Sequence, residues 1–202
     1  MVPENPRNAL AKLGFVIDSR IGGVRRGSTL TDFVCYVNTT IQQAYIWQIS
    51  LVTAKVDIKR MFARVPHKVI CKVLRFFDVP AAWINVLMAQ LVSNTFRITT
   101  IRGDEVEVDL NCGLVEGATC SVLIIGLLLT YFLQKLRSSS TYNQFAYSLP
   151  SDDHQPAVPL GEIGWIDDWV LFTESVAKMQ GLLELWSSVL RDMGVGDKCE
   201  KA

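Results

Sequence analysis

The sequence predicts an α+β domain in which an antiparallel sheet is covered by helices on one face. The first reason is hydrophobic spacing, which follows the helical period in some stretches and the strand period in others. The resulting order is helix, strand, two helices, hairpin, buried helix, hairpin and helix. The second reason is composition, because half of the 202 residues are hydrophobic and 9% are aromatic. Such a chain can bury a sizeable core and is not typical of disordered proteins.

Charge and cysteine content limit the classes of protein to which this chain can belong. The chain has 20 basic and 20 acidic residues, so any basic groove must come from local clustering. Its five cysteines are odd in number and include no C-x-x-C pair, which predicts neither a disulfide framework nor a zinc site. This usage favours a reducing compartment. The N-terminus does not have the pattern of a signal peptide.

The first predicted elements are a helix and a strand. Thr29 and Asp32 have the spacing of a helix start. The helix that follows carries an apolar stripe that we expect in the core, consisting of Phe33, Val34, Val37, Ile41, Ala44 and Tyr45. In the strand at 53–58, apolar residues alternate with polar ones. Asp57 is therefore expected on the face opposite the apolar set.

Two helices and a hairpin come next. Pro66 and Pro80 suit helix starts, and each is followed by an apolar face at helical spacing. Residues 96–101 and 106–110 alternate on either side of a glycine-containing turn, which predicts a β-hairpin. The turn contains Arg-Gly-Asp, and a turn explains this tripeptide better than an adhesion motif does.

The second half begins with a glycine-bracketed loop and an apolar helix. Residues 113–117 could bring backbone close to a ligand or simply turn the chain. Residues 118–133 carry no charge but fall short of the roughly 20 residues that a membrane span needs. A buried core helix is the preferred interpretation, and a membrane-associated protein is an alternative. Residues 138–160 are predicted to form a surface connection, and Gly194 is predicted to end the last helix.

Two adjacent carboxylates, Asp167 and Asp168, lie between two apolar runs that predict a hairpin. Adjacent like charges are unfavourable unless a cation is near, which favours a role for their oxygens in binding one. The alternative is an ordinary polar turn. An antiparallel sheet could bring Asp57 beside them. Three carboxylates without a His or Cys cluster favour Mg²⁺ or Mn²⁺. Two such ions about 3.5–4 Å apart serve in-line phosphoryl transfer.

Three blocks in this order resemble the palm of reverse transcriptases of the non-LTR retrotransposon and group II intron type. Residues 56–67, Val-Asp-Ile-Lys-Arg-Met-Phe-Ala-Arg-Val-Pro-His, are similar to the family's Val-Asp-Leu-x-x-Ala-Phe-Asp-x-Val-Pro-His. Residues 113–117 resemble its Gly-x-x-Gln-Gly loop, and residues 165–168 resemble its Tyr-Ala-Asp-Asp. Residues 22–29 also look like a fingers segment, and 194–201 like a Gly-Leu…Lys block.

The resemblance implies a role for each matching residue. Asp57, Asp167 and Asp168 would be catalytic and would hold two Mg²⁺ (or Mn²⁺) ions. Phe62 matches the ring that blocks a ribose 2′-hydroxyl. The residues expected to contact the template or the incoming nucleotide are Phe62, Gly113, Glu116, Gly117, Lys201, Arg25 and Arg26. For the two arginines, a solvated loop is the alternative.

The chain departs from the family pattern at several positions. Ala63 replaces an Asp that does not bind metal, so we expect a local structural effect. Glu116 replaces Gln, and a carboxylate that only accepts hydrogen bonds should weaken nucleotide or template binding. Val115 brings no charge where relatives often have a basic or polar residue. Trp165 and Ile166 are bulkier than Tyr and Ala beside the catalytic turn.

The resemblance therefore implies an RNA-directed DNA polymerase domain that adds nucleotides from a dNTP to a primer 3′-hydroxyl. Residues 1–50 would be a partial fingers segment and 51–202 the palm, with the thumb absent. The expected partners are an RNA template, a DNA primer and a dNTP, with no membrane, and the thumb and endonuclease of a retroelement polyprotein would be missing. The alternative is a decayed or repurposed palm that binds nucleic acid or serves a structural role. A nuclear or cytoplasmic location is expected, the nuclear one only from the resemblance.

Overall fold

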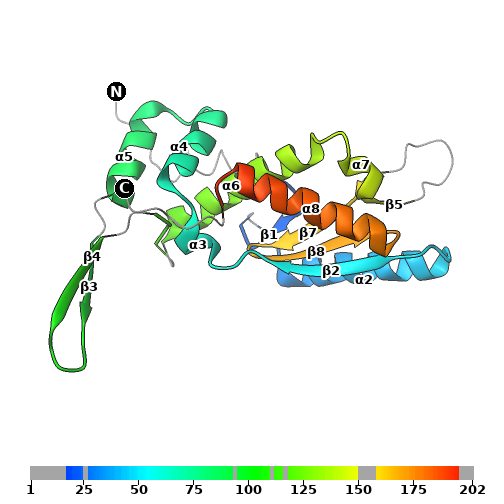
Figure 1. Ribbon diagram of the computed structural model, residues 1–202, viewed down its shortest axis with the longest axis horizontal. Coiled ribbons are helices and arrows are strands. Elements are labelled where there is room, and N and C mark those ends of the chain that lie inside the picture. Colours follow the sequence, from blue (N-terminus) through cyan, green and yellow to red (C-terminus); the bar gives the residue numbers. More distant parts are fainter. Residues whose placement is uncertain are drawn as a thin grey trace.

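A four-stranded sheet in the order β1-β7-β8-β2 forms the centre of the computed structural model (Figure 1). Its strands are β1 (Ile21–Gly22), β2 (Val52–Asp57), β7 (Glu162–Trp165) and β8 (Asp168–Thr173). The β1–β7 pair is parallel and the other two pairs are antiparallel. The predicted α+β fold is confirmed, but the sheet has one parallel pair and carries helices on both faces, whereas an antiparallel sheet with helices on one face was predicted. The structure describes residues 17–24, 27–92, 95–109, 112–115, 118–149 and 158–195.

Helices α6 (Thr119–Arg137) and α8 (Val176–Asp192) cover one face of this sheet (Figure 1). Trp169 of β8 packs against Trp186 of α8 with ring centroids 5.3 Å apart. By length and composition alone α6 could cross a membrane, but two thirds of its apolar window, 67%, is buried inside the protein. The helix predicted at 118–133 is therefore the central core helix.

Helix α2 (Leu30–Ile46) packs on the opposite face of the sheet, over β7, in a second small core that includes Ala44 and Phe172. Thr29 caps it in a reciprocal pair with Asp32, as predicted. The expectation that its whole apolar stripe is core was wrong. Tyr45 is 85% exposed, and Val34 and Ile41 are also exposed. Phe33 and Val37, on the sheet side, are the stripe residues that pack on this core besides Ala44.

Three helices follow β2, namely α3 (Met61–Arg64), α4 (His67–Phe76) and α5 (Ala81–Val92). Pro66 caps α4, and its φ of −63° and missing N–H suit the start of a helix. The backbone N–H groups of residues 83 and 84 donate to the carbonyl of Pro80, which opens α5. Both predicted helix starts are confirmed.

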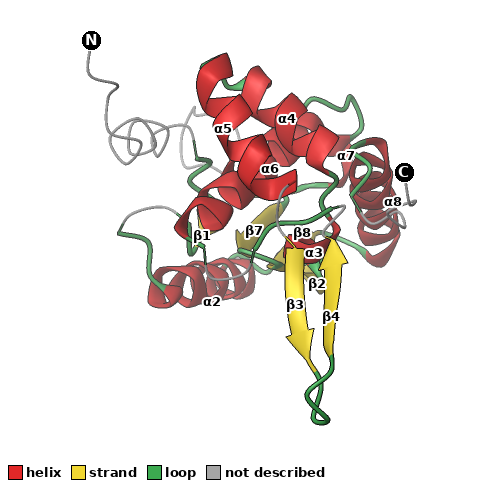
Figure 2. Cartoon of the chain, turned by 90° about the vertical axis from the view of Figure 1, so that its left-hand side faces the viewer, coloured by secondary structure: helices red, strands yellow, loops and turns green. Residues whose placement is uncertain are grey.

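Strands β3 (Thr95–Thr99) and β4 (Glu105–Asp109) form the predicted hairpin. It extends away from the body of the molecule in both views (Figures 1 and 2). Gly103, with φ of +85°, lies at its tip. The Arg-Gly-Asp tripeptide is therefore part of a β-turn.

The prediction of a surface connection at 138–160 was wrong in part. Helix α7 (Tyr142–Phe145) and strands β5 (Tyr147–Leu149) and β6 (Val158–Leu160) lie there, and Tyr142 and Tyr147 are fully buried. Although the segment is rich in Ser, Pro and Asp, three of its large side chains reach the cores, namely Tyr142, Tyr147 and Leu160. The end of the last helix was predicted correctly, because Gly194 follows α8 with φ of +71° and donates to the carbonyl of Arg191.

Candidate active site

Asp57 and Asp168 lie directly opposite each other on neighbouring strands, as the last residue of β2 and the first residue of β8. Residues paired in this way direct their side chains to the same face of a sheet. Alternation in β2 buries Val52, Ala54 and Val56 partly and exposes Asp57, as the sequence predicted. Two carboxylates therefore share one exposed face at the end of the β2–β8 ladder.

Asp167 lies next to this pair, in the turn that joins β7 to β8. Trp165 pairs with Asp168, so the two turn residues are Ile166 and Asp167. The expectation that Asp167 and Asp168 together form the hairpin tip was wrong by one residue. The positive φ that such turns need falls on Ile166, at +55°. A β-branched residue in this conformation is strained.

The strained turn is held on both sides by its neighbours. The indole N–H of Trp169 donates to the carbonyl of Ile166 over 2.9 Å. The backbone N–H of Ile166 donates to the carbonyl of Gly22 in β1. A Cβ at Gly22 would overlap the ring of Trp165, and one at Gly23 would lie 2.8 Å from Cγ1 of Ile166. The two glycines thus leave space for the bulky residues that replace the family's Tyr and Ala.

Lys55 provides the positive charge at this site. Its Nζ lies 3.0 Å from Oδ1 of Asp168, and the Lys55 side chain is 72% exposed. The hydrogen bond to Asp168 is the main cause that raises the pKa of Lys55, and the charges of Asp57 and Asp167 add to it. All three predicted carboxylates therefore lie within electrostatic reach of one ammonium group.

The donor set suits a hard cation only in part. Asp57 and Asp168 supply carboxylate oxygens on one face, which is the chemistry that Mg²⁺ and Mn²⁺ prefer. Among the described residues, however, no group of three or more His, Cys, Asp or Glu side chains is placed to hold a metal ion. The backbone carbonyl of Asp167 accepts from the N–H of Ile58 over 3.0 Å, which fixes the turn beside Asp57.

The glycine loop docks on the segment that follows Asp57. The N–H of Gly113 donates to the carbonyl of Val65 over 2.8 Å, and the N–H of Leu114 donates to the carbonyl of Phe62 over 2.7 Å. A Cβ at Gly113 would lie 2.8 Å from the carbonyl oxygen of Ala63. The loop backbone at Gly113 therefore approaches the backbone of residues 62–65 closely.

Several predicted residues lie outside this assembly or outside the described residues. Phe62 is half-buried and packs against the main core. Nε2 of His67 lies 3.1 Å from the carbonyl oxygen of Gly113, so the Pro-His end of the first block also contacts the second. Arg25, Arg26, Glu116, Gly117 and Lys201 lie outside the described residues.

Among the described residues, Cys35, Cys71 and Cys120 are free thiols.

A buried charge network supports β7 behind the turn. The Glu162 side chain is 0% exposed and accepts hydrogen bonds from Arg20, Arg137 and the hydroxyl of Tyr142. Arg137 also pairs with Asp18. The network ties the segment before β1 to α6, α7 and β7, because a buried carboxylate requires such partners.

Sequence reasoning missed Glu162 and Lys55. Glu162 is the one charged residue in the apolar run before Asp167, and this was a usable signal. Lys55 lies two residues before Asp57 on an alternating strand, so it shares its face.

Known proteins share both the sequence pattern and the fold. A family model described as "Reverse transcriptase (RNA-dependent DNA polymerase)" matches residues 8–202. No curated protein sequence matches the chain significantly. Telomerase from Candida albicans, solved with a TWJ fragment of telomeric RNA, is similar with a TM-score of 0.65 at 13% identity. Apo telomerase from Candida tropicalis, truncated from its C-terminal domain, gives 0.63 at 13% identity.

These likenesses cover 94% of this chain but only 32% and 38% of the two telomerase chains. The chain thus spans about a third of the length of the telomerases that it matches. At such low identity they support the fold alone, and the non-LTR or group II type stays a prediction. The family match, which includes all three predicted blocks, is what decides the assignment: this chain belongs to the reverse transcriptase (RNA-dependent DNA polymerase) family.

Proposed function

We propose that the face bearing Asp57 and Asp168 is the catalytic face of an RNA-directed DNA polymerase. There a primer 3′-hydroxyl would attack the α-phosphate of a dNTP opposite an RNA template, releasing pyrophosphate. The observation that carries the proposal is the cross-strand pairing of Asp57 with Asp168 beside a strained turn. Backbone strain of this kind clusters at functional sites.

Reverse transcriptases generally use divalent metal ions, and we propose Mg²⁺ or Mn²⁺ for this chain. Asp57 and Asp168 would hold the ions together with Asp167, which lies in the turn next to them. When bound, such ions lower the pKa of an attacking hydroxyl and neutralise charge on the phosphate oxygens. Lys55 would release Asp168 at that point, since an exposed ion pair of this kind contributes little.

The chain's own residues would position the reacting groups. Phe62 lies on the segment that the glycine loop fastens, which supports its proposed role beside the sugar of the incoming nucleotide. Trp165 pairs with Asp168 across the hairpin, and so lies on the same face as the two carboxylates. We propose that its ring supports the primer end.

Primer extension tests this proposal. Incorporation of labelled dNTP on an RNA template is measured for the chain alone and for the chain joined to a reverse transcriptase thumb, because phosphate contacts supply most duplex affinity. We expect incorporation in the joined protein, with loss in Asp57→Asn and in Asp168→Asn. Glu184→Gln removes an equal charge from the exposed face of α8 and should retain activity. Absent incorporation, or activity unchanged by both aspartate substitutions, would refute the proposal.

The alternative is a palm that no longer catalyses. Two observations favour it, namely the engagement of Asp168 by Lys55 and the lack of a metal-binding group of three among the described residues. Glu116 in place of Gln points the same way. Absence of Mn²⁺-dependent incorporation in the joined protein would support this alternative.

A further inference from the structure

Helix α4 presents a row of exposed cations on its outer side. Lys68, Lys72 and Arg75 are exposed and follow one another at i, i+4 and i+7, which places them on one face. The opposite face carries Val69, Ile70, Val73 and Leu74, all buried in the main core. The helix contains no acidic residue. Packing of the apolar side therefore fixes the direction in which the cations point.

A fourth cation, Lys135 of α6, joins this row at Tyr131. The Nζ atoms of Lys72 and Lys135 lie 5.9 Å and 5.6 Å from the centroid of the same Tyr131 ring. The ring, only 4% exposed, attracts both ammonium groups, which therefore lie no more than 5.9 + 5.6 = 11.5 Å apart. In the part of the chain that the structure describes, neither lysine forms an ion pair. Two ammonium groups that share one surface and form no ion pair among the described residues attract an anion.

A cavity opens beside the two lysines. Its volume is about 400 Å³, and it lies between α4, α6 and α8. Besides the lysines and Tyr131, its polar lining consists of Ser138, Ser139, Ser188 and Asp192. The Ser138 hydroxyl donates to the carbonyl of Lys135, and the Ser139 hydroxyl shares a hydrogen bond with Thr141. Among the described residues of this lining, the hydroxyl of Ser188 is thus the one left to donate to a phosphate oxygen. Asp192 is the one carboxylate in the lining and opposes an anion.

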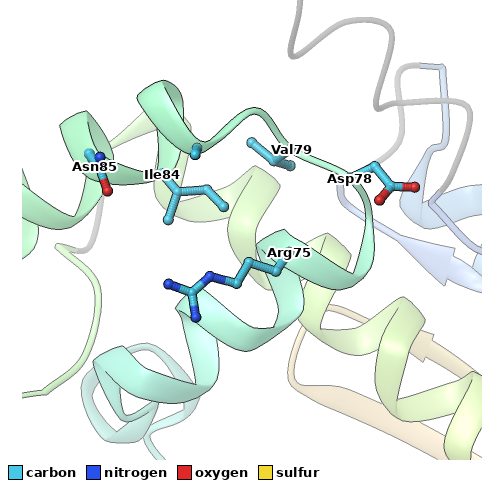
Figure 3. A pocket seen from close by; sticks show the side chains of 6 residues that line it. Arg75, Asp78, Val79, Ile84 and Asn85 are labelled. Atoms are coloured by element: carbon cyan, nitrogen blue, oxygen red, sulfur yellow. The ribbon is translucent and has the colours of Figure 1, made fainter.

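An exposed aromatic ring completes the surface. Phe76 lies one turn beyond Lys72 and is 51% exposed, and its ring meets Tyr131 edge-on at 4.8 Å. Arg75 lies next to it, and Figure 3 shows its side chain reaching below Ile84, while Asp78 lies at the other end of that pocket. Arg75 forms no ion pair among the described residues. Cations that alternate with an exposed ring match the requirements of single-stranded nucleic acid.

This surface is separate from the carboxylate face. Helices α6 and α8 pack on the sheet through residues such as Trp186, whereas the cavity lies on their other side. We propose that the outer surface formed by Lys68, Lys72, Arg75, Phe76 and Lys135 binds single-stranded RNA. The cations contact its phosphates, and a base stacks on Phe76. The bound strand is distinct from the template at Asp57, so the inference does not depend on catalysis.

Fluorescence anisotropy with a labelled single-stranded RNA of about 15 nucleotides, in EDTA, tests the proposal. The Lys72→Gln, Lys135→Gln double variant should bind about tenfold more weakly, with a salt slope reduced by about 0.7 per lysine. Asp192→Asn should bind more tightly. Phe76→Leu keeps the apolar contact with the core and should weaken binding with an unchanged salt slope.

Three controls make the result specific. Lys178→Gln removes a cation that is paired with Glu174 on α8, and should bind RNA as the unmodified chain does. The Lys72→Arg, Lys135→Arg variant keeps both charges and should also bind normally. Asp57→Asn should leave this binding unchanged while primer extension is lost, which separates the two proposals.

Two outcomes would overturn the inference. One is equal weakening by Lys178→Gln and by Lys72→Gln, which would indicate a general effect of net charge. The other is tighter binding of an acidic peptide than of RNA, with the same dependence on Lys72 and Lys135, which would make this a protein-docking surface instead.

Discussion

Asp57 and Asp168 face each other as like charges, and this arrangement has a cost before any ligand binds. Charges of one sign placed directly opposite on neighbouring strands destabilise a sheet. Lys55 relieves part of the repulsion through Asp168. Selection for turn or strand propensity would not retain such a pair, so the residues reflect a function that stability alone does not explain.

Asp57→Asn should therefore separate stability from cation binding. We expect the free energy of unfolding without metal to rise by about 0.2–1 kcal/mol, because the cross-strand repulsion is removed. Mn²⁺ should raise the melting temperature of the unmodified chain and leave that of the variant unchanged. Thermal unfolding with and without Mn²⁺ measures both effects. Equal Mn²⁺ stabilisation of the two proteins would show that Asp57 is not a ligand.

Gly113 occupies a backbone position that other residues can adopt only with strain. It has φ of +90°, and a Cβ there would meet the backbone of Ala63. Gly27 has a similar φ of +84°, but a Cβ would find open space there. The two glycines thus share a backbone conformation and differ in crowding.

Alanine at these two positions should have unequal effects in urea unfolding. Gly27→Ala should lower the free energy of unfolding by about 1–2 kcal/mol, which is the cost of placing alanine in the left-handed backbone conformation. Gly113→Ala should lower the free energy of unfolding by about 1–3 kcal/mol more, because the loop must move away from α3. Primer extension should fall only for Gly113→Ala. Equal losses would mean that the contact with Ala63 relaxes freely.

At the scale of elements, the buried network of Glu162 connects four parts of the chain. Tyr142 of α7 donates its hydroxyl hydrogen to Glu162 of β7, while Arg20 and Arg137 reach the same carboxylate. Burial, and then the charge of Glu162, raise the pKa of Tyr142 above its usual 10.0. A raised pKa in the folded state stabilises the fold fully below pH 10 and progressively less above it.

Tyr142→Phe should accordingly change how stability depends on pH. Near neutral pH the free energy of unfolding of the variant should be about 1.5–3 kcal/mol lower, because a hydrogen bond to a charged group is lost. Above the ordinary tyrosine pKa of 10.0, the stability of the unmodified chain should fall more steeply than that of the variant. Urea unfolding between neutral pH and about pH 11 measures both slopes. Parallel slopes would show that Tyr142 ionises as easily folded as unfolded.

The sequence predicted the helices and strands better than it predicted which parts of the chain they pack against. Capping residues Thr29 and Gly194 and the prolines before α4 and α5 act locally, so their signals survive in the fold. The small elements α7, β5 and β6 were missed because burial of Tyr142 and Tyr147 depends on distant segments. The outward half of the α2 stripe was misjudged for the same reason, since hydrophobic spacing does not say what covers a helix.

At the scale of the whole molecule, the resemblance predicted a candidate site, and the structure shows which of its described residues lie together. Alternation placed Asp57 on the correct face. It did not predict which residue of the Trp-Ile-Asp-Asp run takes positive φ, because that depends on the register of β7 with β8. Nor did it predict the outer cationic surface, which combines α4 with a lysine more than 60 positions later (135 − 72 = 63).

The sheet order β1-β7-β8-β2 has a consequence for how the protein is made. Strand β2 pairs only with β8 among the described strands, and Asp57 meets its partner 168 − 57 = 111 positions later. Loop closure over such distances slows folding, since its entropy must be lost before the contact forms. On a ribosome, β2 would leave the exit tunnel long before β8 exists. The two aspartates of the proposed catalytic face are therefore among the last residues to come together, and a nascent chain paused before β8 would have no such face.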